Sequence, residues 1–393
     1  MEHWTADSRL PLAVDALSLS ESDPAARRLM EAFDGDPVAV EERLVGEPAT
    51  VSRRLRFSSQ TDVILHDDAI VAVSFRTAPA HGTSGLRDGS DWVGSLDEQT
   101  TLDDLAVGLG ERPRFAGTAP YFELGGGYAR ADFRDGRGWN DPGNFLGVTI
   151  TIDQPGLACR PEDDDCPVCS DLLVRPAGQA TGVDVRGTVE ALSTGLAAGV
   201  LSEDVHRVRL ADVQPLFASR LMRRVETQLT CSACRRIICF TLHRDSSPTV
   251  EYTVLNDATR RPVEPIPPVE LWGDADRIAA DRAGMHYVDH EPESWFLVEQ
   301  EGVLYLEARY SYSAIVDSSA LIRLDDAERE RYRTDGHNAL SDLATQIHNS
   351  APYREESAYF QRNLYRGSDA KQYRDAVARA ISNRTWLAER SRG

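Results

Sequence analysis

Lysine is almost absent from this chain of 393 residues, in which Lys371 is the single lysine and every other basic residue apart from histidine is an arginine. No lysine follows a glycine-rich loop, which excludes a G-x-x-x-x-G-K-[ST] phosphate-binding loop and a kinase-type lysine. Lys371 lies in a charged stretch that we expect to be helical, with no apolar pocket to lower its pKa. We therefore discount Schiff-base chemistry as well.

Long hydrophobic runs are also missing, and no segment is long and apolar enough to cross a bilayer. The first ten residues carry Glu2, Asp7 and Arg9 and lack the continuous apolar core of a secretory signal. We therefore expect a soluble, cytoplasmic protein without a membrane partner. Cysteines stay reduced in that compartment, so paired C-x-x-C units predict metal or redox sites rather than disulfides.

Acidic residues outnumber basic ones by 63 to 43, which leaves a formal net charge of −20. A field of that sign repels phosphate groups, so it disfavours free association with nucleic acid or an anionic membrane. The same field attracts a basic protein, which makes such a protein the expected partner.

The length exceeds what one hydrophobic core usually supports, while 41% hydrophobic and 27% charged residues fit a globular chain. The predicted fold class is α+β, with antiparallel-sheet domains, short helices and an inserted zinc-binding module. We predict an N-terminal α+β domain over 1–155, a four-cysteine zinc module with a helical insertion over 156–260, and a C-terminal α+β domain with terminal helices over 261–393. The last boundary falls at the proline-rich run 262–268, which interrupts regular structure.

Local patterns predict several elements. Asp67 and Asp68 form a tight turn between two apolar strands, and Gly125–Gly127 predict a second hairpin turn rather than a phosphate loop. Thr101 precedes a short helix that ends at Gly110. Apolar residues at helical spacing predict an amphipathic helix over 336–349, and further helical stretches are expected at 188–200 and 205–225.

The strongest chemical signal is two cysteine pairs, Cys166-Pro167-Val168-Cys169 and Cys231-Ser232-Ala233-Cys234. Two such turns can supply the four thiolates that Zn²⁺ binds in tetrahedral structural sites. The pairs resemble the knuckles of zinc-ribbon proteins, in which Cys-Pro-x-Cys is common. The 61 residues between Cys169 and Cys231 require a helical insertion. We predict that Cys166, Cys169, Cys231 and Cys234 bind one structural zinc ion.

Two alternatives stay open for these pairs, namely unliganded cysteines and a redox C-x-x-C motif. The redox alternative requires a thiol pKa that is lowered at a helix N-terminus, a setting that neither pair clearly has. Cys159 can replace one thiol or join a mixed ligand set. Cys239 lies in an apolar run, where a small buried hydrophobic residue is expected.

Weaker motifs are interpreted as structural. His286, Asp289, His290 and Glu291 lack the spacing of a zinc-protease helix, so we expect a solvated loop. His81-Gly82-Thr83-Ser84-Gly85 lacks the spacing and the preceding strand of a serine nucleophile turn. Asp135 and Asp141 lack the ligand pattern of a calcium loop. No nucleophile and base stand at a recognisable spacing, and we expect a protein that is not an enzyme.

A basic patch supports a different hypothesis. Between Arg207 and Arg244 the sequence holds eight arginines, including Arg223-Arg224 and Arg235-Arg236, against two acidic residues. The forked guanidinium groups of arginines beside zinc knuckles can bind phosphate groups. The alternative function is therefore zinc-dependent nucleic-acid binding through the 207–244 patch. Neutralisation of these arginines by acidic neighbours is the simpler interpretation.

The segment 50–152 carries a resemblance to a known group of proteins. A helix over Thr100–Leu105, the turn Leu109-Gly110-Glu111-Arg112-Pro113 and the strands through Tyr121-Phe122 and Asp132–Gly136 follow one another. This order resembles small bacterial immunity proteins of polymorphic toxin systems. The resemblance implies a protein that covers the active face of a toxin, and it implies an acidic surface where the toxin is a basic nuclease. The expected function is therefore non-enzymatic binding of a macromolecule, as an immunity-type or regulatory protein with a basic protein partner.

Overall fold

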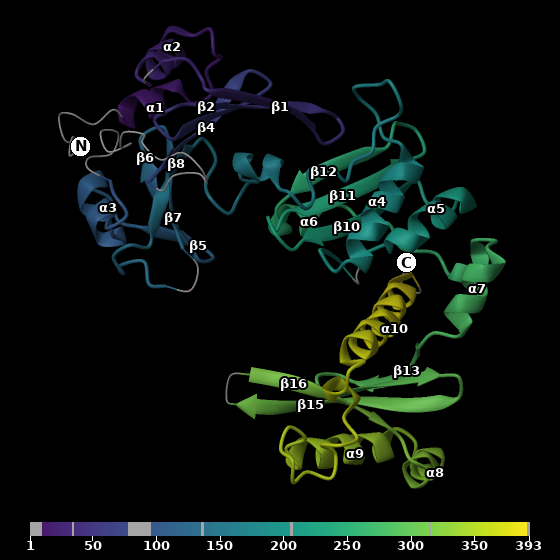
Figure 1. Cartoon of the computed structure of the whole chain (residues 1–393). Helices are drawn as coiled ribbons and strands as arrows, with labels where there is room; N and C mark the ends of the chain where they lie inside the picture. Colours follow the sequence, from purple (N-terminus) through teal and green to yellow (C-terminus); the bar gives the residue numbers. More distant parts are fainter. Residues whose placement is uncertain are drawn as a thin grey trace. The chain divides into compact units, whose positions relative to one another are not determined.

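The protein has an α+β fold with three antiparallel sheets (Figure 1), as the sequence predicts. The computed structural model describes residues 10–33, 35–77, 96–134, 137–204, 207–313 and 316–390. The chain forms two compact units, Met1–Ser202 with Gln228–Pro262, and Glu203–Thr227 with Val263–Gly393. The last change of unit falls in the proline-rich run, where residues 262–268 form neither helix nor strand. The division into three domains remains a prediction.

The first unit is built on an eight-stranded sheet of order β1-β2-β3-β4-β8-β7-β6-β5. Neighbouring strands are antiparallel throughout, as hairpin connections allow. The strands are β1 (Ala39–Val45), β2 (Thr50–Arg56), β3 (Thr61–His66), β4 (Ala69–Arg76), β5 (Arg114–Ala116), β6 (Ala119–Leu124), β7 (Gly127–Phe133) and β8 (Phe145–Thr151). The two predicted hairpins are confirmed, one between β3 and β4 and the other between β6 and β7.

Three short helices cover the apolar face of this sheet, namely α1 (Leu10–Ala16), α2 (Pro24–Glu31) and α3 (Leu102–Leu109). Helix α2 begins at Pro24, because Asp23 caps it and the proline suits its first position. Helix α3 begins with a capping box between Thr101 and Asp104 and ends at Gly110, whose φ of 66° favours glycine. Their apolar residues share one core with the strands.

The opposite face of the same sheet is polar and still buried. Arg54 on β2, Asp62 on β3 and Arg130 on β7 are all less than one tenth exposed. Ser74 on β4 forms a hydrogen bond with Thr149 on β8 at 2.6 Å. Buried charges need partners of opposite sign, so the segment that covers this face has to supply acidic groups.

The second sheet has the order β12-β11-β10-β9 and carries both strands of the second cysteine hairpin. Its strands are β9 (Leu201–Glu203), β10 (Arg224–Cys231), β11 (Ile237–His243) and β12 (Thr249–Thr253), and the helices nearby in sequence are α4 (Val185–Ala197), α5 (Leu210–Ser219) and α6 (Leu255–Arg260). The predicted helical insertion between the cysteine pairs is confirmed by α4 and α5. Of the helical stretches predicted within 205–225, α5 ends at Ser219, where Arg220 is left-handed, and Arg224 and Val225 already belong to buried strand β10.

The third sheet belongs to the second unit and has the order β13-β14-β15-β16. Its strands are β13 (His286–Glu291), β14 (Trp295–Gln300), β15 (Val303–Ser313) and β16 (Val316–Arg323). The predicted amphipathic helix is α9 (His337–Asn349), whose buried Leu340, Leu343 and Ile347 pack with the sheet; α8 (Asp326–Asp335) precedes it. Helix α10 (Ala370–Arg390) packs in a separate cluster through Val377. None of the described helices is long and apolar enough to span a lipid bilayer.

The expectation of a solvated loop at His286–Glu291 is wrong, because these residues form edge strand β13. The sequence of this strand shows no alternation of apolar and polar residues, because all of its side chains are exposed or half-buried. Two of its carboxylates bind one side chain of α9. His337 Nδ1 lies 2.9 Å from Asp289, and His337 Nε2 lies 2.7 Å from Glu291.

The His337 contacts predict a pH-dependent stability of the second unit. Hydrogen bonds to Asp289 and then to Glu291 raise the pKa of His337. A group whose pKa is raised in the folded state contributes its full stabilisation at pH values below its ordinary pKa, which is about 6.5 for histidine. This stabilisation is lost as the pH rises through the pKa of the folded state. We expect unfolding of this unit to become easier by at most about 1 kcal/mol from about pH 6 to pH 9, because the group is partly exposed. His337→Gln should flatten this part of a pH series of chemical unfolding, and an unchanged pH dependence in that variant would refute the assignment.

Candidate metal centre

The first cysteine pair lies in a turn that directly follows the 3₁₀ helix η2 (Pro161–Asp165). Cys166 forms the C-terminal cap of η2, and its carbonyl accepts a hydrogen bond from the Ser170 backbone amide at 3.1 Å. The tight turn points both thiols inward, and both cysteines are buried.

The second pair spans the hairpin between β10 and β11. Cys231 is the last residue of β10, and its amide donates to the Arg236 carbonyl at 3.0 Å. Cys234 lies in the connecting turn, and Arg235 after it has a φ of 64°. This left-handed residue brings the chain back into β11 within a few residues, so both thiols face the same side of the hairpin.

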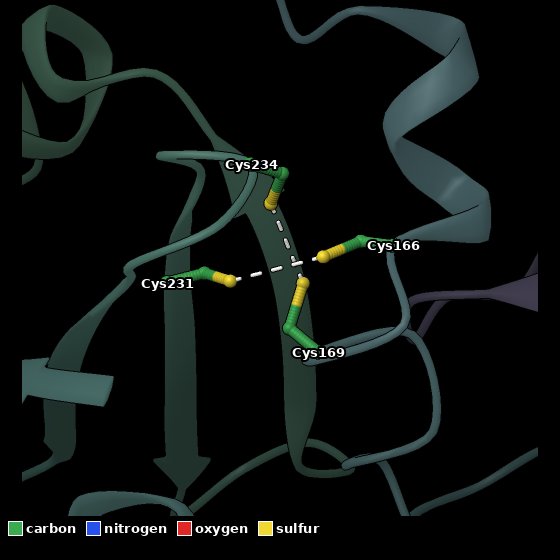
Figure 2. Close-up of side chains that lie close together, drawn as sticks. All are labelled: Cys166, Cys169, Cys231 and Cys234. Carbon is green, nitrogen blue, oxygen red and sulfur yellow. Dashed lines mark hydrogen bonds between the residues drawn. The ribbon is translucent and has the colours of Figure 1, made fainter. Parts of the chain in front are cut away.

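The structure brings all four predicted thiols together (Figure 2). The four Sγ atoms lie within 4.8 Å of one another, and all four residues are buried. The Sγ atoms of Cys166 and Cys231 are 3.8 Å apart, and those of Cys169 and Cys234 are 3.5 Å apart. Zn–S bonds of about 2.3 Å in a tetrahedron place neighbouring sulfurs about 3.8 Å apart. The cluster therefore has the size of a tetrahedral S4 site and could hold a metal ion.

The pairing of the sulfurs bears on the two alternatives. The close contacts join one C-x-x-C turn to the other, whereas a redox motif would join the two thiols of one turn. All four cysteines are free, and a disulfide would need about 2.05 Å between its sulfurs. The hydrogen bond between the two thiols lowers the pKa of Cys234 and raises the pKa of Cys169. The geometry favours one shared site over two separate dithiols.

Arg236 places a buried positive charge against this cluster. Its side chain is only 3% exposed, and its Nη2 lies 3.8 Å from the Cys169 Sγ. Its Nη1 donates to Asp164 at 2.8 Å, and its guanidinium lies 4.2 Å above the Tyr252 ring. Tyr252 in turn donates its hydroxyl to the Cys169 carbonyl at 2.8 Å. A tetrathiolate site around a divalent ion carries two net negative charges, which Arg236 partly compensates.

Asp164 connects Arg236 to the eight-stranded sheet. The buried carboxylate contacts Arg236 on one side and the Nε2 of His66, the last residue of β3, at 2.7 Å on the other. Burial alone would raise the pKa of Asp164, but the hydrogen bond from His66 and the charge of Arg236 lower it overall. Asp164 is therefore held as a carboxylate between the Arg236 guanidinium and the His66 ring.

Two other acids of η2 bind the polar face of the sheet in the same way. Glu162 pairs with Arg130 of β7, and Asp165 pairs with Arg54 of β2. Arg43 of β1 lies 3.3 Å from Asp165. The acidic helix in front of Cys166 thus supplies the partners that the buried arginines need, and it fixes the first cysteine turn on the sheet. In the sequence, the only local feature that indicates this contact is the run of four acidic residues directly before Cys166.

The two remaining cysteines lie outside the cluster of four thiols. Cys239 on β11 is fully buried with Ile237 and Ala258, as expected for a small hydrophobic residue. Cys159 is half-buried, and burial raises its pKa to about 12. Cys159 is consequently a thiol rather than a nucleophilic thiolate near neutral pH.

The arginines of the 207–244 patch do not form one exposed surface. Arg236 is buried under the cysteine cluster, and Arg224 pairs with Glu226. Arg209 has only a long contact of 3.9 Å with Glu203, while Arg235 is exposed. Acidic neighbours neutralise several of these charges, which is the simpler of the two interpretations of the patch.

Among the minor motifs, Asp141 accepts a hydrogen bond from the Gly138 amide at 2.7 Å within its own loop. The His81–Gly85 motif and Asp135 lie outside the described residues. Comparisons of the chain with protein-family models, with curated proteins and with solved structures find no match.

Proposed function

We propose that the four thiols of Cys166, Cys169, Cys231 and Cys234 bind one Zn²⁺ and that the ion is structural. The supporting observation is the closed, buried S4 cluster with sulfur separations of 3.5 and 3.8 Å. Four protein ligands leave no open coordination position for a substrate or a reactive water, which is typical of structural zinc. The thiols have to stay reduced to bind the ion, as they do in the cytoplasm.

The ion would join two parts of the first unit. One pair of ligands follows η2, which is bound to the polar face of the eight-stranded sheet, and the other pair belongs to the hairpin of the second sheet. A metal ion that connects two segments 61 residues apart lowers the conformational entropy of the unfolded chain, and it also holds the two segments together in the folded protein. This arrangement fits a structural metal site better than a catalytic one.

For the protein as a whole, we propose non-enzymatic binding of a basic protein, in an immunity-type or regulatory role. The net charge of −20 supports this proposal, because long-range attraction accelerates and orients association with a basic partner. The resemblance of residues 50–152 to immunity proteins supports it independently. The burial of Arg236 weakens the nucleic-acid alternative, since a buried guanidinium cannot reach a phosphate backbone.

Binding experiments separate the two functions. We expect the purified chain to retain basic proteins from an extract, and we expect the affinity for a purified partner to fall as salt screens the attraction. Retention of DNA and RNA should be weak at about 150 mM salt. The alternative is tested with Arg223, Arg224 and Arg235 replaced by glutamine, while Arg236 is left intact so that the cysteine cluster is preserved.

Each outcome favours one function. Strong nucleic-acid retention that is lost in the triple variant would replace the basic-protein proposal. Retention of acidic proteins, or an affinity for the partner that does not change with salt concentration, would contradict the electrostatic argument. Metal analysis of the same preparation tests the zinc proposal separately.

A further inference from the structure

A cavity of about 660 Å³ opens in the second unit, whereas the cysteine turns belong to the first unit. Its walls come from residues 207–212, from residues 266–272 at and beyond the end of the proline-rich run, from α7 (Ala275–Arg282) and from the first turns of α10. Cavities of this size are typical of small-molecule sites.

One arginine of the wall is already neutralised. Arg277 on α7 donates to both carboxylate oxygens of Asp212, with Nη2 3.0 Å from Oδ2, and its guanidinium lies 5.6 Å above the Trp272 ring. Asp281 lies 3.9 Å from the same guanidinium. This bidentate pair ties two walls of the cavity together and leaves Arg277 with little capacity for a ligand.

Two other arginines of the wall lack full partners. The Nε of Arg209 is buried, and within the described part of the chain it donates to no acceptor. The nearest carboxylate oxygen is that of Glu203 at 3.9 Å, and the other Glu203 oxygen accepts the Leu210 amide at 2.6 Å. Arg379 on α10 is half-buried and forms no hydrogen bond or ion pair with any described residue. Burial, followed by the positive charge of Arg209, lowers the pKa of Arg379, and the carboxylates of Asp375 and Glu203 only partly oppose this effect.

Buried donors without acceptors destabilise a fold unless a ligand or water satisfies them. An anion between Arg209 and Arg379 would satisfy the orphan donor and relieve the repulsion between the two cations. Two guanidinium groups match a phosphate dianion in charge and in fork geometry better than they match a single carboxylate. Met285 and Tyr373 line the same cavity and offer apolar surface beside these cations.

We propose that this cavity binds a small phosphorylated molecule, with Arg209 and Arg379 on its phosphate group and its apolar part toward Met285 and Tyr373. The proposal concerns a second site that does not depend on the metal centre.

The test is isothermal titration of the full chain at low salt with AMP, inorganic phosphate and adenosine as probes. We expect one site per chain for AMP, weaker binding of inorganic phosphate, and no binding of adenosine. Arg379→Gln and Arg209→Gln should each weaken AMP binding about tenfold or more, since each removes a charge-assisted contact. Arg379→Lys should retain part of the affinity, because it keeps the charge but loses the fork.

Arg282→Gln is the matched control, because Arg282 is exposed on the neighbouring helix α7 and does not line the cavity. Its affinity for AMP should equal that of the unchanged protein. Thermal unfolding of each variant shows whether a loss of binding reflects a loss of folding. Adenosine that binds as tightly as AMP, affinities that respond equally to Arg282 and Arg379 replacement, or no saturable binding of AMP or phosphate would each overturn the proposal.

Discussion

Replacing Cys166 by serine is expected to release the metal and to lower the thermal midpoint of the first unit by about 10–20 °C. Binding of a structural zinc ion contributes on the order of 10 kcal/mol to folding, so the loss of one of four thiolates can cost about 5 kcal/mol. For a domain of this size about 1 kcal/mol corresponds to about 2–4 °C. Metal content by mass spectrometry and a thermal scan measure the two effects on the same sample.

Cys159→Ser provides the matched control, because Cys159 is a half-buried cysteine outside the group of four thiols. It should keep one zinc per chain and an almost unchanged midpoint. Hydrogen exchange adds an internal control, since the amides of residues 228–231 at the end of β10 and those of β11 should lose protection in Cys166→Ser, while those of β14 and β15 in the other unit should keep it. Equal stability with and without a chelator would contradict a structural metal.

The cysteine cluster could be predicted from the sequence because its information is local. Each C-x-x-C unit defines a turn, and two such turns have few ways to satisfy four thiolates other than one tetrahedral ion. The same holds for α2, α3 and α9, whose caps and apolar spacing lie within a few residues. Patterns of this kind predict the structure correctly because they depend only on the geometry of neighbouring residues.

The partners of the cluster could not be predicted in this way. Arg236 contacts Asp164 across 72 residues, and Glu162 contacts Arg130 on a strand that no local rule associates with it. In the sequence Arg235 and Arg236 are indistinguishable neighbours, yet the first is exposed and the second is buried. Both residues lie in the turn before β11, and the left-handed Arg235, with a φ of 64°, sends the two side chains to different environments in a way that neither residue type reveals. The edge strand at His286–Glu291 was missed for a related reason, because its exposed side chains give no period.

The contrast between these two arginines provides a sharp test of the metal centre. Arg236→Gln should destabilise the first unit by about 3–5 kcal/mol, because it leaves the Asp164 carboxylate buried with one cationic partner fewer. It should also weaken metal binding about 10–100-fold, the range expected when a group that supports the ligands is removed. Arg235→Gln, one residue away and exposed, should change stability by no more than about 0.5 kcal/mol.

A double-mutant cycle separates the two roles of Arg236. If its main role is to compensate Asp164, then Asp164→Asn combined with Arg236→Gln should cost clearly less than the sum of the two single changes, with a coupling of about 0.5–3 kcal/mol. If its main role is to compensate the thiolates, metal affinity should remain low in the double variant even where stability recovers. Competition with a coloured zinc chelator measures the affinity, and urea unfolding measures the stability. Equal effects of Arg235→Gln and Arg236→Gln on both quantities would show that the buried guanidinium does not support the site.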